Sequence, residues 1–308
     1  MIAIMKSSIR SLIVVLLPII CSPLTKAITP SPDDSHSPFP ISTASSTVPP
    51  TATITATPSP TEPPYFATGF DTDLVLEETD SMERSASPDW WLNSGAWFVQ
   101  QGGVGSTWIG EAPSDSRWRG LYNRSNPQDT DGGAHPQNVF RLITRSEWGS
   151  PVQQIYFRIV GINPSASPNR GRSNGVLLFS RYRDEDNLYY AGLRVDGYAV
   201  IKRKAGGVYT TLAETSWFAG TYDRSALPNL IPLQTWVGLR TVMLVEGNTV
   251  TILLYVDPDR SGFWILALQA EDILDVLQPP ATPGRGGIRT DFMDVEFDDY
   301  RIEERIAE

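Results

Sequence analysis

The stretch LLFSRYRDEDNLYYAGLRVDGYAVIKRKAGGVYTTLAE, residues 177–214, decides the fold class. It divides into short runs rich in aliphatic and aromatic residues, separated by turn-forming Asp, Asn and Gly. Leu188–Val195 and Ala199–Arg203 flank Asp196-Gly197, a typical two-residue hairpin turn. This part of the chain is therefore predicted to form consecutive antiparallel strands.

The same pattern extends outward from this stretch in both directions. Further runs have either period-two character or a high content of β-branched and aromatic residues. They lie at Ala96–Gln100, Asn138–Thr144, Gln153–Val160, Gly175–Tyr182, Trp236–Val245, Thr249–Val256, Phe263–Gln269 and Val295–Ile302. Asp272–Leu277 is the one helix-like segment, and it is short. Roughly a dozen strands at hairpin spacing predict an all-β domain over residues 65–308, a two-sheet antiparallel jelly-roll sandwich.

Four blocks of this domain carry a family resemblance. They are Trp91–Gln100 (W-x3-G-x-WFVQ), the stretch 177–214, the strand pair within 236–264, and the closing GGIRTDFMDVEFDDYRI at 286–302. Together they resemble the concanavalin A-like lectin/glucanase superfamily, which includes laminin-G-like domains and secreted bacterial jelly-roll proteins. The resemblance implies the fold and an activity on glycans, but the superfamily holds lectins, binding modules, hydrolases and lyases alike.

The first 27 residues predict export. Lys6 and Arg10 precede the apolar run Leu12–Ile20, and Ala27 offers a small residue for cleavage. We expect a signal peptide and a secreted, extracellular protein. Cys21 raises an alternative, because it lies where the acylated cysteine of a bacterial lipoprotein would lie. The preceding residue is Ile instead of the small residue of that pattern. A lipid at Cys21 would be the only predicted membrane attachment.

Residues 28–64 predict a disordered linker. This segment contains 15 Ser or Thr residues and 10 Pro residues. Such a composition cannot bury a core, and its prolines keep the chain extended. We expect a spacer between the leader and the folded domain.

Composition excludes several kinds of site. The net charge of −10 argues against non-specific nucleic-acid binding. The single cysteine lies in the leader, so the domain has no disulfide framework, cysteine zinc site or catalytic thiol. Lysine occurs only at positions 6, 26, 202 and 204, so 21 of the 25 cationic residues are arginine. Arginine suits bidentate contact with carboxylates, which is compatible with acidic ligands.

A retaining hydrolase of the laminarinase type is disfavoured. The family resemblance implies an E-x-D-x-x-E strand for that activity, in which two of the acids act as nucleophile and acid. The nearest match is Glu296–Arg301, where Arg301 replaces the third acid.

A polar strand face is the preferred candidate site. Gln154, Tyr156 and Arg158 alternate with apolar residues and so leave one face of a strand. Arg141 lies on the preceding strand, and His135 and Asn138 lead into it, so we expect these side chains to line one concave sheet. For a polysaccharide lyase the catalytic residues would be Tyr156, His135 and Arg158. For simple binding the ligand contacts would be Arg141, Gln154, Tyr156, Arg158, Asn138 and Trp118. A solvated sheet face with cross-strand pairs explains the same pattern without any ligand.

Two further features extend the site hypothesis. Trp118 lies between two arginines in a polar stretch, so we expect it to be exposed, where sugar rings could stack on it. Asp71, Asp73 and Asp298 offer oxygen ligands for a structural calcium ion, and Asp129 and Asp131 offer a second set in a long polar loop.

Extracellular recognition of a polysaccharide is the function that these observations favour. The alternative is a glycan-degrading enzyme, with β-elimination ahead of hydrolysis because an Arg/Gln/Tyr face exists and a complete carboxylate motif does not. An adhesion module that contacts another protein is the third class left open.

Overall fold

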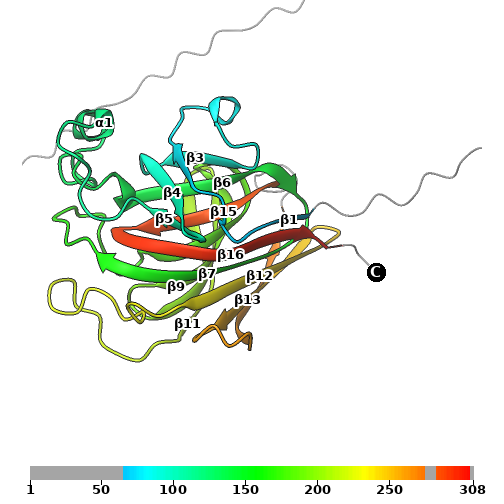
Figure 1. The fold of residues 1–308 in the computed structure, drawn as a ribbon. Coiled ribbons are helices and arrows are strands. Elements are labelled where there is room, and N and C mark those ends of the chain that lie inside the picture. The colour runs from blue at the N-terminus through cyan, green and yellow to red at the C-terminus, as the bar shows by residue number, and fades with distance from the viewer. Residues whose placement is uncertain (1–64, 275–281, 306–308) are drawn as a thin grey trace, which may run out of the picture. The chain divides into compact units, whose positions relative to one another are not determined.

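The computed structural model describes residues 65–274 and 282–305, which form a two-sheet β-sandwich (Figure 1). The strands are β1 (Tyr65–Thr68), β2 (Leu74–Glu77), β3 (Trp90–Ser94), β4 (Trp97–Gln101), β5 (Val104–Thr107), β6 (Val139–Trp148), β7 (Pro151–Ile162) and β8 (Gly175–Asp184). They continue with β9 (Asn187–Arg194), β10 (Tyr198–Ala205), β11 (Val208–Ser216), β12 (Val237–Glu246), β13 (Thr249–Asp257), β14 (Ile265–Ile273), β15 (Gly284–Asp291) and β16 (Met293–Glu304). The predicted all-β jelly-roll sandwich is confirmed.

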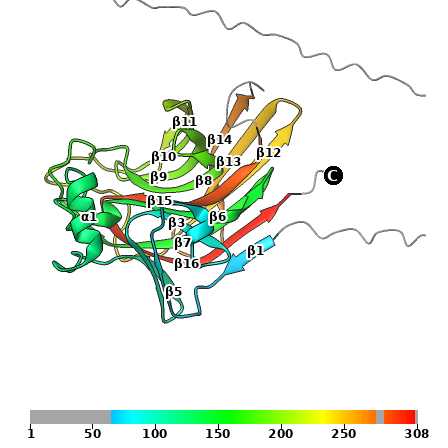
Figure 2. The ribbon, with the colours of Figure 1, turned by 90° about the horizontal axis from the view of Figure 1, so that it is seen from above.

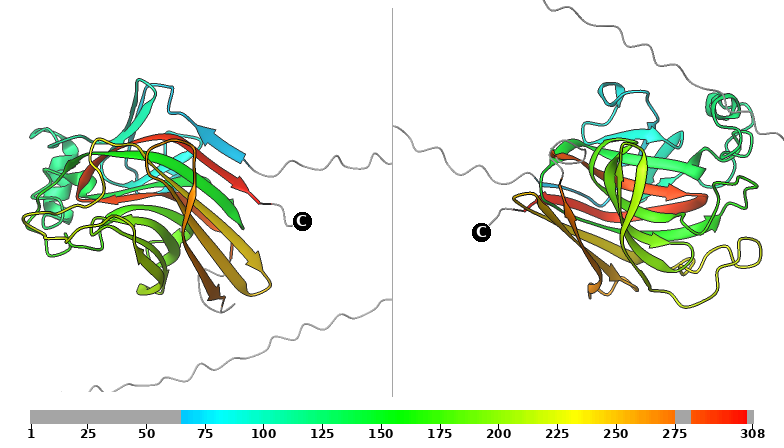
Figure 3. Two further views of the ribbon diagram at one scale, coloured as in Figure 1. Left: turned by 90° about the horizontal axis from the view of Figure 1, so that it is seen from below. Right: turned by 180° about the vertical axis from the view of Figure 1, so that it is seen from behind.

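The strands are divided between a seven-stranded and a nine-stranded sheet. The smaller sheet has the order β11-β10-β9-β8-β15-β6-β3. The larger has the order β14-β13-β12-β7-β16-β5-β4-β2, and β1 pairs with β16 beside this path. The last two strands, β15 and β16, run through the middle of opposite sheets, and the two layers can be followed in Figures 2 and 3.

The main hydrophobic core lies between the two sheets. Alternate residues of each strand point into it, as on β13, where Ile252, Leu254 and Val256 are buried. The smaller sheet contributes Leu178 and Ile288 from β8 and β15. Each such side chain stabilises the fold by about 1.5–3 kcal/mol through the apolar surface that it removes from water.

The hairpin predicted at Asp196-Gly197 is confirmed. It joins β9 to β10, with Leu193 opposite Ala199, but its loop consists of the three residues 195–197 instead of the two that were predicted. Gly197 has a φ of +81°, and a Cβ atom built on it would lie 2.4 Å from the carbonyl oxygen of Phe218. Only glycine meets both requirements, one of which comes from the turn and the other from the contact with Phe218.

The prediction of a helix over Asp272–Leu277 was wrong for its first two residues. Asp272 and Ile273 end β14, and residues 275–277 lie outside the described part of the chain. The α-helix that the described residues contain is α1 (Arg117–Ser125), at one end of the sandwich in Figure 2. Its N-cap is Ser116, whose side chain accepts a hydrogen bond from the amide of Arg119. Two 3-10 turns, η1 (Met82–Arg84) and η2 (Pro136–Asn138), complete the elements.

The strands that were expected to share a concave sheet do not. β6 pairs with β3 and β15 in the smaller sheet, whereas β7 pairs with β12 and β16 in the larger one. Between them, the amides of Gly149 and Ser150 donate to the carboxylate of Glu304, at 2.8 and 2.6 Å. These two residues therefore carry the chain from one sheet to the other.

The predicted leader, linker and acylation site at Cys21 lie outside the described residues and stay predictions. Within the part that the structure describes, no helix has the length and hydropathy needed to cross a membrane.

Candidate functional site

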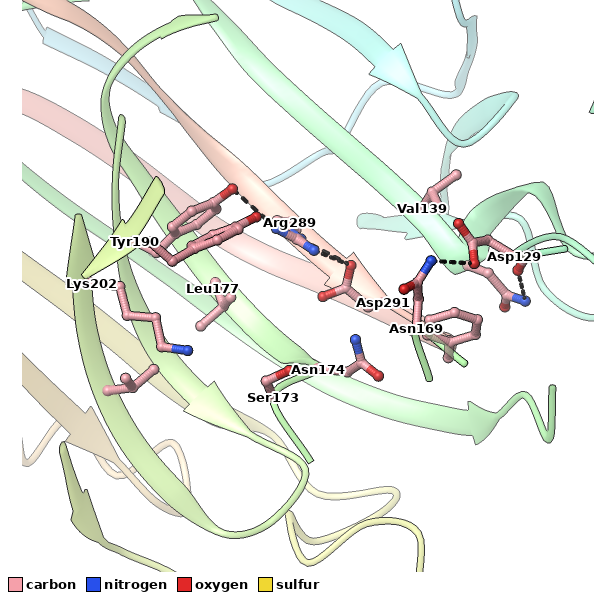
Figure 4. Close-up of a pocket in the computed structure, with 14 residues that line it drawn as sticks. Asp129, Val139, Asn169, Ser173, Asn174, Leu177, Tyr190, Lys202, Arg289 and Asp291 are labelled. Carbon is pink, nitrogen blue, oxygen red and sulfur yellow. Dashed lines mark hydrogen bonds and ion pairs between the residues drawn. The ribbon is translucent and has the colours of Figure 1, made fainter. Parts of the chain in front are cut away.

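A pocket of about 460 Å³ opens on the outer face of the seven-stranded sheet (Figure 4). On β8, Leu178 points into the core between the sheets, and its neighbour Leu177 points the other way, into the pocket. Pairing between neighbouring strands brings further side chains to the floor of the pocket. Arg289 lies opposite Leu177, and Lys202 lies opposite Tyr190. The loop before β8 supplies the rim through Asn169, Ser173 and Asn174.

Arg289 and Asp291 form the polar floor of this pocket. They alternate on β15 and so share its outer face. Arg289 donates from Nε to Oδ1 of Asp291 at 2.9 Å, and from Nη1 to the hydroxyl of Tyr190 at 3.0 Å. Asp291 is only 4% exposed, and its Oδ2 atom is buried with no hydrogen-bond partner among the described residues. The pocket therefore holds an unused acceptor next to a satisfied ion pair.

Two tyrosines form an aromatic wall. The rings of Tyr190 and Tyr209 stack with centroids 6.0 Å apart and an interplanar angle of 22°. Tyr190 is buried, and Tyr209 is 52% exposed. Burial raises the pKa of Tyr190. Burial also raises the pKa of Tyr209, but the positive charge of Arg289, hydrogen bonds to Tyr190 and Arg289, and the charge of Lys204 outweigh it, so the net pKa is lowered.

Lys202 faces the pocket from β10, with its ammonium directed inward (Figure 4). It makes no hydrogen bond or ion pair with any described residue, whereas Lys204 on the same strand pairs with Asp186 at 3.1 Å. Partial burial lowers the pKa of Lys202, and the positive charge of Arg194 lowers it further. Lys202 is thus a half-buried cation without a counter-charge in contact.

A second hollow of about 190 Å³ adjoins the pocket and shares Tyr190, Tyr209 and Arg289 with it. It is bounded by Arg141, which donates from Nε to Ser94 at 3.1 Å and pairs with Glu185 at 3.3 Å. Of the predicted ligand contacts, Arg141 therefore lies on this surface. Asn138 lines the pocket too, but its amide is bonded to Asp129, Asp131 and Asn163.

The other polar residues of the predicted face lie on the nine-stranded sheet. Gln154 accepts from Arg240 at 2.7 Å, and Arg158 pairs with Glu296 and stacks on Trp236 at 4.8 Å. Tyr156 is buried and donates to Asp257 at 2.9 Å, and burial together with this bond raises its pKa to about 12. Their side chains are occupied by contacts within the sheet.

His135 lies in the loop before η2, with its Nδ1 3.5 Å from the amide of Gln137. No contact between His135 and Tyr156 or Arg158 occurs among the described residues. The structure therefore does not bring the three predicted catalytic residues together.

The expectation that Trp118 is exposed was wrong. It lies on the inner side of α1 and is 7% exposed. Its ring contacts Tyr122 at 6.3 Å and Trp97 at 6.5 Å, and Arg117 covers it at 4.7 Å. The tryptophan anchors the helix to the sandwich instead of offering a platform to a ligand.

Among the described residues, the predicted calcium ligands Asp71, Asp73 and Asp298 do not form a metal-binding group. Asp298 is bound to Arg260 at 2.6 Å, and Asp73 accepts the amide of Gly102 at 3.1 Å. The carboxylate oxygens of Asp129 and Asp131 all accept hydrogen bonds; the donors are Asn126, Asn138, Ser165, Ser167 and Asn169. Nowhere in 65–274 or 282–305 do three or more His, Cys, Asp or Glu side chains form a metal-binding group.

Sequence reasoning did not select five residues of the pocket: Tyr190, Lys202, Tyr209, Arg289 and Asp291. One signal was present. Beyond residue 26, lysine occurs only at 202 and 204, two positions that alternate along one predicted strand. Such spacing puts both ammonium groups on one face.

Comparisons with known proteins agree with the fold and assign no activity. No family model and no curated protein matches the chain. Solved structures similar to it include winged bean acidic lectin in complex with methyl-α-D-galactose, with 11% identity, a TM-score of 0.45, and coverage of 80% of this chain and 100% of the lectin. A prokaryotic β-1,3-1,4-glucanase from a mouse hindgut metagenome has 11% identity and a TM-score of 0.41, with coverage of 79% and 99%. The carbohydrate-binding module CBM66 of Bacillus subtilis has 17% identity and a TM-score of 0.36, with coverage of 54% and 82%.

The sheet order defines a two-sheet antiparallel sandwich of the jelly-roll type, as the sequence predicted. At these identities and at TM-scores below 0.5, the comparisons add nothing about ligand or chemistry.

Proposed function

We propose that the protein recognises a carbohydrate in the pocket on the outer face of its seven-stranded sheet. The observation that carries this proposal is that one pocket is lined by three groups suited to a ligand. They are a half-exposed aromatic ring, a buried carboxylate oxygen without a hydrogen-bond partner, and an ammonium group without an ion-pair partner. These groups belong to Tyr209, Asp291 and Lys202.

A sugar matches this combination chemically. Its hydroxyl groups can donate to Oδ2 of Asp291 and accept from the ammonium of Lys202, and its C–H face can pack on the ring of Tyr209. Leu177, Val200 and Phe292 supply the apolar remainder of the lining. A small number of placed polar groups among apolar ones is typical of ligand pockets.

Affinity gel electrophoresis tests the proposal. The protein is run through gels that contain a panel of neutral and acidic polysaccharides, and retardation is measured. We expect at least one polysaccharide to retard it. Tyr209→Ala should remove the retardation, because it removes the stacking surface. Tyr65→Ala is the matched control, since Tyr65 is 60% exposed but lies on β1 of the other sheet. Equal retardation of both variants would exclude this pocket as the site.

Glycan cleavage by β-elimination is the second candidate function, and it is favoured by the half-exposed Tyr209 beside the cations Arg289 and Lys204, whose charges lower its pKa. A tyrosinate can remove the proton α to a uronate carboxylate as the glycosidic C–O bond breaks, and the departing oxygen then takes up a proton. Absorbance of the new C=C bond in the ultraviolet reports this reaction. The lyase roles proposed for Tyr156, His135 and Arg158 are tested by substitution in the same assay.

We infer that the protein acts outside the cell, because residues 1–27 have the pattern of an export signal and 28–64 that of a spacer. Mass spectrometry of the exported protein separates the two alternatives. Cleavage after Ala27 would give a free secreted form, and a lipid on Cys21 would give an anchored form.

A further inference from the structure

We propose that the carbohydrate is an acidic one, whose anionic group is bound by Lys202. This inference rests on the proposed function of the same pocket and adds the class of ligand. Carboxylate groups of uronic acids and sulfate esters share the required chemistry.

The distribution of lysine supports an anion site. The chain carries a net charge of −10, yet both lysines beyond residue 26 face this surface from β10. Arg141 and Arg289 join them, so four cations line the two adjoining hollows. The same linings contain three carboxylates, those of Asp129, Glu185 and Asp291, so the cations exceed the anions by one.

Among these four cations, Lys202 differs from the other three in its ion pairing. Arg289 is neutralised by Asp291, Arg141 by Glu185, and Lys204 by Asp186. Lys202 alone of the four has no ion pair among the described residues. A half-buried ammonium that contacts no counter-charge has lost part of its hydration, and the more distant carboxylate of Glu214 compensates for this only in part. An anionic ligand would supply the missing counter-charge.

The neighbouring groups favour a sugar acid over a simple inorganic anion. Asp291 lines the same pocket and has a buried, unpartnered Oδ2 atom, and Tyr209 adds a half-exposed ring that is stacked on Tyr190. A carboxylate oxygen repels a free anion and requires a hydroxyl donor. A ring that carries both hydroxyls and an acid group satisfies Lys202, Asp291 and Tyr209 together.

Matched polymers test this inference. Polygalacturonate, the galactan made from it by carboxyl reduction, and a sulfated galactan are each placed in affinity gels with the protein. We expect the reduced galactan to bind at least about tenfold more weakly than an acidic polymer, as the loss of one charge-assisted contact implies. Retention by polygalacturonate alone would assign a carboxylate, and retention by the sulfated galactan alone would assign a sulfate ester.

Two variants separate a specific contact from a general charge effect. Lys202→Gln should weaken binding of the acidic polymer at least about tenfold and leave the melting temperature close to that of the parent. Arg301→Gln removes the same charge from β16 of the other sheet and should leave binding unchanged. The acidic ligand would be excluded if acidic and reduced polymers bound equally and Lys202→Gln did not change binding. If Tyr209→Ala still abolished binding in that case, the pocket would remain a carbohydrate site. Binding of no polymer in the panel would overturn both.

Discussion

Asp291 forms an ion pair that stabilises the fold and also lines the pocket proposed to bind a ligand. One of its carboxylate oxygens holds Arg289, and the other is buried and unpartnered in the pocket. A buried ion pair of this kind costs much to break, because the remaining partner keeps its charge without compensation.

Asp291→Asn should therefore lower both properties. We expect the free energy of unfolding to fall by about 1–3 kcal/mol, and retardation by the bound polysaccharide to weaken. Urea denaturation and the affinity gel measure the two effects. Asp80→Asn is the control, because Asp80 and Arg84 form a pair that is about 70% exposed at both ends. Its loss should cost no more than about 1 kcal/mol. A stable Asp291→Asn variant would contradict the structural role.

Tyr156 predicts a dependence of stability on pH. Its pKa is raised to about 12 in the folded protein from an ordinary value near 10. Between these values the folded protein keeps a proton that the unfolded chain releases, so this contribution to stability is complete below pH of about 10 and is lost as pH rises toward about 12. We expect urea midpoints to fall over this range, and to fall less in Tyr156→Phe. An unchanged slope in that variant would show that other buried tyrosines carry the effect.

At the scale of elements, the β9–β10 hairpin depends on a glycine at position 197. Gly197→Ala would place a side chain at positive φ and against the carbonyl oxygen of Phe218. We expect a loss of more than about 1 kcal/mol in the free energy of unfolding. Gly247→Ala is the matched control, since Gly247 has a φ of +61° but no atom within 4 Å of a new Cβ. It should lose less, and equal losses would show that backbone strain alone decides the effect.

The elements that the sequence predicted are long and periodic. β7, β12 and β13 show stretches of alternating burial, which period-two patterns in the sequence reveal. β8 is buried on both faces over its first eight residues and was found by its aliphatic and aromatic content. Helix α1 was missed because RWRGLYNRS has a glycine, three arginines and little apolar pattern. Its stability comes from the Ser116 cap and from Trp118 against Trp97, a contact with a distant strand. Propensity over nine residues does not contain that information.

The candidate site was predictable only in part, and the reason lies in the link between β6 and β7. A two-residue link between strands is typical of a hairpin, which would place β6 and β7 side by side in one sheet. Instead, Glu304, far along the chain, accepts hydrogen bonds from the amides of Gly149 and Ser150, and the two strands enter different sheets. Arg141 thus remained on the pocket surface, while Tyr156 and Arg158 went to the opposite sheet. Which sheet a strand joins is decided by long-range pairing.

At the scale of the whole molecule, the outer faces of the two sheets differ in whether the polar side chains named below have partners within the protein. On the nine-stranded sheet, Arg158 is engaged by Glu296 and by the ring of Trp236. On the seven-stranded sheet, the pocket retains the unpaired Lys202 and the unpartnered oxygen of Asp291. Ligand binding should therefore depend on one face and not on the other.

Arg158→Gln and Arg289→Gln test this division with the same change of charge on opposite sheets. We expect Arg158→Gln to leave retardation by the polysaccharide within about twofold of the parent, because its partners lie inside the sheet. Arg289→Gln should weaken retardation at least about tenfold, because Arg289 holds Asp291 and Tyr190 in place around the ligand. Both variants lose an ion pair, so urea midpoints must be compared to correct for unfolding. The reverse order of effects would move the site to the face of β7, where Tyr156 and Gln154 would then be the next residues to substitute.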